Sequence, residues 1–202
     1  KADALAQGNK PAEAKAAFAE AAAKYADTAA KYPEFERVNR AKYGQALCFI
    51  ALEDYEKAAK ALEGIPAAER SGDLAAASYV LADCLIRTAP ARAEDALQDN
   101  MLREKLLAAA GLLDAFVGAN PKAEQTPDAL LKLGYCHKRL GIQLAPGNER
   151  NEALQKARAA FERLGNEFKQ SPLVGAAALE RAKVLALQGD RGNAIHALRA
   201  FG

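Results

Sequence analysis

Three cysteines are the side chains of this 202-residue chain that could most readily bind a metal or take part in redox chemistry. Cys48, Cys84 and Cys136 each stand two residues after a small residue of a predicted helix. Equivalent positions on stacked helices are about 8–10 Å apart, which exceeds disulfide reach and is too wide for three thiolates to share one zinc ion. Val184 holds the same position in a fourth helix. The pattern therefore predicts buried, unpaired thiols that pack as small apolar side chains.

The other polar residues show no pattern typical of a catalytic site. His137 stands where Phe49 and Leu85 stand in other predicted helices, so we expect a packed imidazole, and His196 lies elsewhere in the pattern. No Ser or Cys nucleophile has a recognisable base nearby, no carboxylate pair stands out, and the glycines form no phosphate-binding loop. We predict no catalytic residue, no metal site and no cofactor.

The composition favours closely packed helices. Half of the residues are apolar, Trp is absent, and the alternation typical of strands is missing. The net charge of +2, with acids and bases interspersed, gives no electrostatic footprint for nucleic acid. The most apolar segment, 106–119, is interrupted by Asp114 and is shorter than the roughly 20 residues that cross a bilayer. We expect neither a nucleic-acid partner nor membrane insertion of this chain.

One stretch, 126–141, provides the reference for a recurring pattern. Thr126 can cap a helix, Pro127 suits its first turn, and Gly141 can adopt the positive φ that ends it. Gly134 aligns with a small residue in each of three other predicted helices, Ala46, Ala82 and Ala182. A turn follows all four of these helices. The pattern predicts four first helices of helical hairpins.

A second motif marks the partner helix of each hairpin. It is a small residue, an apolar one four positions later, and a third apolar or small residue three further on, which together form one helix face. The five triplets are Ala14, Phe18, Ala21; Ala58, Leu62, Ile65; Ala109, Leu113, Phe116; Ala157, Phe161, Leu164; and Ala194, Leu198, Phe201. Two hairpins are longer than the others, with inserts near 88–100 and 142–151, where 93–99 could add a helical turn or two. Because residue 1 is Lys and predicted helices occupy 1–7 and 193–201, we expect a fragment of a longer array.

Several parts of the pattern resemble tetratricopeptide repeats, which are helix–turn–helix units of about 34 residues. These parts are the segments 41–43 and 52–58, the pair Leu133 and Gly134, and Gly189-Asp190 before Ala194. The resemblance implies an all-α fold, a right-handed α-solenoid of about nine to ten helices that forms a single repeat domain over 1–202. Segments 31–33, 126–134 and 171–190 are similar to bacterial cell-envelope members of the tol-pal and outer-membrane-assembly type. That similarity implies the periplasm or cell envelope, whereas three unpaired thiols favour the alternative, the reducing cytoplasm.

The resemblance also implies a concave groove lined by the first helices. The positions that line it in such repeats are occupied here by Arg40, Tyr43, Leu47, Tyr79, Asp83, Arg87, Leu131, Tyr135, Lys138, Arg139 and Lys183, together with Ile50, Ala76, Ile86, Asp128, Leu179 and Leu187. Such a mixture can bury an apolar side chain of a partner and pair with a carboxylate. Tyr43 and Leu47 replace two residues that clamp a C-terminal carboxylate in chaperone-tail-binding members, so that ligand class is not expected.

Two functions of different classes follow from the sequence. The leading hypothesis is a non-catalytic protein–protein interaction scaffold that binds a protein or peptide segment in the groove, in a bacterial cell-envelope complex. The alternative is a structural or oligomerisation module attached to a catalytic domain outside this fragment.

Overall fold

The computed structural model describes residues 11–92 and 96–199, all of whose regular elements are helices. The chain divides into two compact units, Lys1–Thr88 and Ala89–Gly202. The predicted helices at 1–7 and around 93–95, and the triplet residue Phe201, lie wholly or partly outside the described residues. The single repeat domain stays a prediction, and the two units are described separately.

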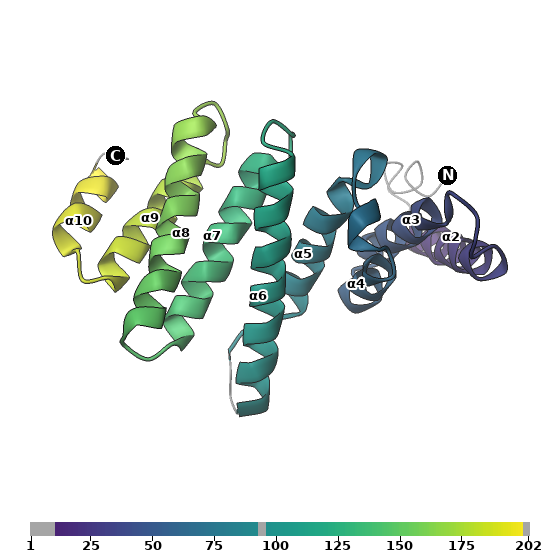
Figure 1. Cartoon of the computed structure of the whole chain (residues 1–202), viewed down its shortest axis with the longest axis horizontal. Coiled ribbons are helices and arrows are strands. Elements are labelled where there is room, and N and C mark those ends of the chain that lie inside the picture. The colour runs from purple at the N-terminus through teal and green to yellow at the C-terminus, as the bar shows by residue number, and fades with distance from the viewer. Residues whose placement is uncertain (1–10, 93–95, 200–202) are drawn as a thin grey trace. The chain divides into compact units, whose positions relative to one another are not determined.

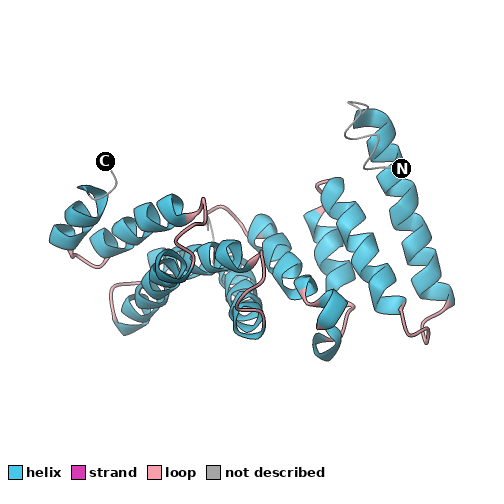
Figure 2. Cartoon of the chain, turned by 90° about the horizontal axis from the view of Figure 1, so that it is seen from above, coloured by secondary structure: helices cyan, strands magenta, loops and turns pink. Residues whose placement is uncertain are grey.

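Unit 1 contains two first helices and two second helices. Its elements are α2 (Pro11–Lys31), α3 (Val38–Ala51), α4 (Tyr55–Glu63), the 3-10 turns η1 (Ala67–Glu69) and η2 (Gly72–Leu74), and α5 (Ala76–Thr88). Figure 2 shows α2, α3 and α4 side by side, and α5 packs on α4. Glu53 ends α3 with a positive φ of 60°, and the Asp54 side chain caps α4 by accepting from the Lys57 backbone N–H at 3.2 Å. The predicted turn after α3 is confirmed.

Unit 2 contains the longer helices. They are α6 (Ala96–Ala119), α7 (Thr126–Gln143), α8 (Asn148–Glu167), α9 (Val174–Leu187) and α10 (Arg191–Arg199). Each packs against the next along the chain, and α6, α7 and α8 lie side by side (Figure 1). At the second predicted insert, residues 142–151 extend α7 and start α8, with a short connection at 144–147. In the first predicted insert, Thr88 ends α5, residues 89–92 belong to the connection, and 96–100 start α6.

The core follows the predicted register fully in three of the five second helices, and only in part in α2 and α10. The small residues Ala46, Ala82 and Ala182 are at most 2% exposed, and Gly134 is buried. The triplets of α4, α6 and α8 are buried throughout, with no member more than 3% exposed. In α2 the triplet is half covered at Phe18. The α10 triplet is wrong at Leu198, which is 47% exposed because no described helix covers its outer face.

Gly134 allows α7 and α8 to approach closely. A Cβ atom at Gly134 would lie 2.5 Å from Cζ and 2.7 Å from Cδ1 of Phe161, whose ring is only 2% exposed. Nothing larger than hydrogen fits between the α7 backbone and this ring.

Two boundary predictions for α7 are wrong. Gln125 holds the N-cap position, and Thr126 is the first helical residue, whose hydroxyl donates to the Asn120 carbonyl at 2.5 Å. Gly141 does not end the helix, which continues to Gln143. A Cβ there would lie 2.8 Å from Cδ2 of Leu154, so packing against α8 is what favours glycine at this position.

The three cysteines are buried and form no disulfide within the described residues, as the repeat position predicts. Burial raises the pKa of the Cys84 thiol to about 11 and that of Cys136 to about 12. Both thiols are therefore protonated near neutral pH and weakly nucleophilic.

We predict that Gly134→Ala destabilises the protein although it favours helix formation. The added methyl group forces the Phe161 ring to move, and overpacking of this kind costs about 1–3 kcal/mol, against a gain of about 1 kcal/mol from helix propensity. Urea unfolding should therefore show a net loss of up to about 2 kcal/mol. Gly165→Ala is the matched control, because nothing lies within 4 Å of its added Cβ in α8. That variant should gain about 0.5–1 kcal/mol, and equal stability of the two variants would contradict the packing argument.

We also predict slow thiol labelling in the folded protein. Maleimide, followed by intact-mass measurement at pH 7, should leave Cys48, Cys84 and Cys136 largely unmodified and should modify all three in denaturant. Rapid modification of a native thiol would show that the first helices expose it.

Candidate protein-interaction surfaces

A buried carboxylate links the two first helices of unit 2. Glu180 of α9 is 5% exposed, and its carboxylate accepts from the ammonium groups of Lys138 on α7 and Lys183 on α9, the latter at 2.6 Å. The Lys138 side chain is 15% exposed, whereas that of Lys183 is 53% exposed. We call Tyr135, Lys138, Glu180 and Lys183 the Glu180 cluster. Two cations share one anion, so the cluster carries a net positive charge.

Tyr135 forms the aromatic part of the Glu180 cluster. Its ring meets Phe161 edge to face, with centroids 5.9 Å apart and planes at 79°, and the Lys138 ammonium lies 5.0 Å from its centroid. Burial, with the negative charge of Glu180, raises the pKa of Tyr135. The phenol is therefore neutral at physiological pH.

The Glu180 carboxylate stays ionised although it is buried. Burial alone raises its pKa, but the hydrogen bonds from Lys138 and Lys183 and their charges bring the pKa below the ordinary value of 4.5. Hydrogen bonding to Glu180 likewise raises the pKa of Lys183. The three charged side chains form a fixed group at the surface of α7 and α9.

Other predicted groove residues of unit 2 serve the packing. Leu131 is 8% exposed and so offers little surface to a partner. The Arg139 guanidinium donates to the Pro90 carbonyl at 2.6 Å and holds the segment before α6.

Leu179, by contrast, is exposed. It lies one turn before Lys183 on α9, is 44% exposed and adds an apolar side chain beside the Glu180 cluster.

In unit 1 the predicted groove residues form separate exposed pairs. Arg40 pairs with Asp73 of η2, both with side chains more than half exposed. Asp83 accepts from Arg87 at 2.7 Å, and the Arg87 guanidinium lies 4.9 Å from the Tyr55 ring centroid. Such exposed pairs are worth little individually.

The remaining predicted residues of unit 1 differ in exposure. Tyr43 and Tyr79 are half-buried, and burial raises the pKa of Tyr43. Leu47 is 43% exposed on α3. Unit 1 thus also exposes an apolar side chain at a predicted groove position.

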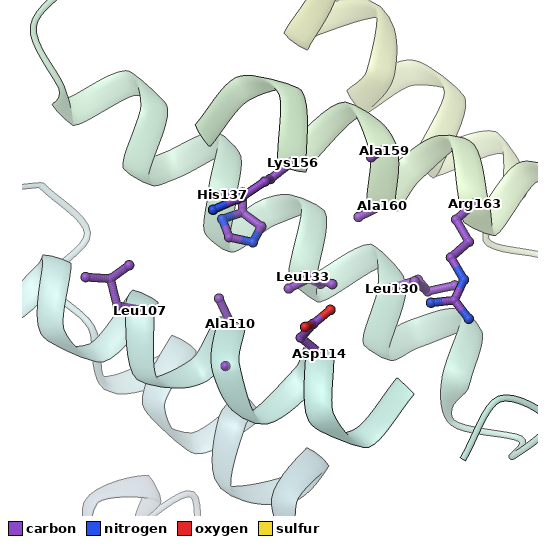
Figure 3. Close-up of a pocket in the computed structure, with 11 residues that line it drawn as sticks. Leu107, Ala110, Asp114, Leu130, Leu133, His137, Lys156, Ala159, Ala160 and Arg163 are labelled. Atoms are coloured by element: carbon purple, nitrogen blue, oxygen red, sulfur yellow. The ribbon is translucent and has the colours of Figure 1, made fainter. Parts of the chain in front are cut away.

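Figure 3 shows a groove between α6 and α8. The α7 residues that line it lie on the side of α7 away from the Glu180 cluster. It has a volume of about 410 Å³, and Leu130, Leu133 and His137 of α7 form its floor. Figure 3 shows His137 next to Lys156, with Asp114 of α6 and Arg163 of α8 farther along. Burial and the nearby Lys156 lower the pKa of His137, so its imidazole is neutral at pH 7. His137 is half-exposed on this groove, so the expected full packing is only partly found.

Neither metal ligation nor membrane crossing is supported by the described residues. Within 11–92 and 96–199, no three His, Cys, Asp or Glu side chains gather as a metal site. In the same ranges, every helix is too short or too polar to cross a membrane.

Sequence reasoning missed Glu180. A single glutamate on an amphipathic helix resembles a solvated residue, and its burial arises only from contact with α7. The one available signal is the spacing of Glu180 and Lys183, three residues apart on one helix.

Two segments of the chain match the family model of the tetratricopeptide repeat, residues 40–67 and 128–171. They fall on the hairpins α3–α4 and α7–α8. The chain is also similar to the crystal structure of nearly identical TPR-like repeats of a chain described as a Podosopora anserina kinesin light chain. The TM-score is 0.63 at 16% identity, over 99% of this chain and 89% of that one. No curated protein matches.

These comparisons confirm part of the resemblance. The all-α fold of stacked helical hairpins is confirmed, and the sequences of two hairpins match the family model of the tetratricopeptide repeat. Nothing in them supports the cell-envelope subgroup.

We predict that Glu180→Gln lowers stability by about 1–3 kcal/mol at pH 7, because it leaves the half-buried cationic pair without its anion. The folded pKa of Glu180 is depressed, so its stabilisation is complete above pH 4.5 or so and is lost as pH falls through the folded pKa. Urea unfolding between about pH 6 and pH 3 should therefore show a smaller loss of stability in Glu180→Gln than in the parent.

Glu152→Gln is the control for this experiment. Glu152 also pairs with a lysine, Lys156, at 2.7 Å, but both side chains are more than half exposed. This variant should unfold like the parent at pH 7. Equal effects of the two substitutions would show that burial gives Glu180 no special role.

Proposed function

We propose that this chain is a non-catalytic protein-interaction scaffold whose first helices, above all α7 and α9, bind a protein or peptide segment. Tetratricopeptide repeats generally mediate protein–protein interactions, and two hairpins match them. The observation that carries the proposal is the net positive Glu180 cluster beside exposed Leu179.

The chemistry of this surface suits a partner with an apolar side chain next to a carboxylate. Leu179 and the half-exposed Tyr135 ring offer apolar area, while Lys183 is the exposed cation of the cluster. Because Glu180 holds both lysines in place, less conformational entropy is lost when a partner binds. Partner binding at this site should weaken as salt is added.

The compartment is part of the proposal. The sequence resemblance favours a bacterial periplasm or cell envelope, with the cytoplasm as the alternative. Fractionation of the native host, with the protein detected by antibody, distinguishes the two.

We predict that Leu179→Glu removes binding of the partner. The variant places a carboxylate on the apolar patch and next to Lys183. This carboxylate should repel an acidic segment and should itself pair with the Lys183 ammonium. Parent and variant proteins are immobilised, the proteins captured from host lysate are quantified by mass spectrometry, and candidates are titrated by calorimetry. The partner's affinity for Leu179→Glu should fall at least about tenfold, equivalent to about 1.4 kcal/mol.

Leu198→Glu on α10 is the matched control. Leu198 is 47% exposed, close to the 44% of Leu179, but it lies outside the Glu180 cluster. Retention of the partner by Leu198→Glu and loss by Leu179→Glu supports the proposal. Equal retention by both variants contradicts it, and loss by Leu198→Glu alone favours the structural or oligomerisation module.

A further inference from the structure

A second groove lies in unit 1, between α2 and α4. It has a volume of about 580 Å³. Phe49 and Gln45 of α3 form its floor. Small residues form much of its walls, namely Ala26, Ala29 and Ala30 of α2, Ala61 of α4 and Gly64 directly after α4. Because these walls carry short side chains, the ring of Phe49 stays half-exposed. The groove therefore has an apolar base that the described residues of unit 1 do not fill.

Three lysines line the same groove, and no carboxylate does so within the described part of the chain. The Lys57 ammonium lies 5.7 Å from the Phe49 ring centroid and pairs with Asp54 at 2.6 Å, so its charge is compensated. Lys42 donates to the Gly64 carbonyl at 2.7 Å, a neutral acceptor that leaves the charge of the ammonium uncompensated. Lys60 stands one turn after Lys57 on α4 and adds a further positive charge.

We propose that this α2–α4 groove binds an acidic protein segment that places one large apolar side chain on Phe49 and carboxylates beside Lys42 and Lys60. The charge of the groove selects an anionic partner, and its apolar base selects a partner that also carries an apolar side chain. A nucleic-acid backbone would satisfy the lysines but would leave the alanine walls uncovered. The acidic protein segment matches both features.

The α2–α4 groove is distinct from the surface in the proposed function. Leu47 and Phe49 of α3 differ by about 200° around the helix axis, because each residue turns the helix by about 100°. The groove therefore lies on the opposite side of α3 from the predicted groove position of Leu47. A segment in the α2–α4 groove leaves that face free for a second partner.

The equivalent groove of unit 2 has different chemistry. His137 replaces Phe49 three residues after the aligned small residue, and Asp114 lines that groove together with Lys156 and Arg163. A mixture of both signs gives an acidic segment less attraction there. The two grooves share a position in the repeat, but only that of unit 1 has a purely cationic lining.

The test uses a fluorescein-labelled peptide in which Asp and Glu residues flank a single Phe, with anisotropy as the measurement on the full chain. We expect saturable binding that weakens when salt is raised from about 0.05 to about 0.5 M. Lys60→Glu should weaken it about tenfold, and Lys60→Gln by a smaller factor. Lys15→Glu is the control, because Lys15 is an exposed lysine of α2 about three turns from the nearest groove residue, Ala26.

Two further probes test the apolar and the protein character of the partner. Replacing the peptide's Phe by Ala should weaken binding several-fold, since the contact with Phe49 is lost. A labelled oligothymidylate should bind more weakly than the acidic peptide. The proposal is overturned by peptide binding that is unchanged in Lys60→Glu, by equal binding of the Ala peptide, or by tighter binding of the oligonucleotide. The peptide also suits the Glu180 cluster, so the titrations are repeated in Leu179→Glu, which blocks that surface. Saturable binding that remains in Leu179→Glu and weakens when Lys60→Glu is added belongs to the α2–α4 groove, whereas complete loss in Leu179→Glu overturns the groove proposal and leaves the proposed function standing.

Discussion

The contact between the Phe161 ring and Gly134 is the constraint on which the rest of unit 2 depends. The ring is almost fully buried, and it reaches the α7 backbone only because residue 134 has no side chain. The same ring meets Tyr135 edge to face, so the approach of α7 and α8 also fixes the aromatic side chain of the next residue. Tyr135 in turn contacts the Lys138 ammonium, which pairs with Glu180. A packing requirement inside the core therefore determines the arrangement of charges at the surface.

The charged pairs of the two units differ in how deeply they are buried. Exposed pairs such as Arg40 with Asp73 lose most of their attraction to solvent screening and side-chain entropy. Glu180 is costly to bury, but it receives hydrogen bonds from two lysines, and its carboxylate stays ionised as a result. The α7–α9 surface is therefore arranged before a partner arrives, whereas the pairs of unit 1 can rearrange. Pre-organisation of this kind is why the first-helix surface of the proposed function is placed in unit 2.

Recurrence in the sequence predicted the helices and most of the core, because a buried small residue and its apolar partners repeat at fixed spacing. Predictions from the sequence failed where the same residue type can have two different structural roles. Gly141 resembled a helix stop because glycine tolerates positive φ, but the structure uses it for contact with Leu154. Glu180 was missed because a single sequence does not show which neighbouring helix will cover a charged residue. Leu131 was assigned to the groove from its repeat position, and only the packing of α7 shows that it is buried.

The first helices offer two sides to partners, and the second helices decide what the rear side can bind. Phe49 and His137 occupy the same repeat position, yet the groove above Phe49 is lined by lysines and alanines of α2, α3 and α4, while that above His137 has Asp114 of α6. The floor residue contributes shape, and the flanking helices contribute most of the charge. Substitutions on a second helix can therefore change the specificity of a rear groove without altering the first-helix side, because the two sides share few side chains. This separation lets the chemistry of the two sides of a first helix vary independently.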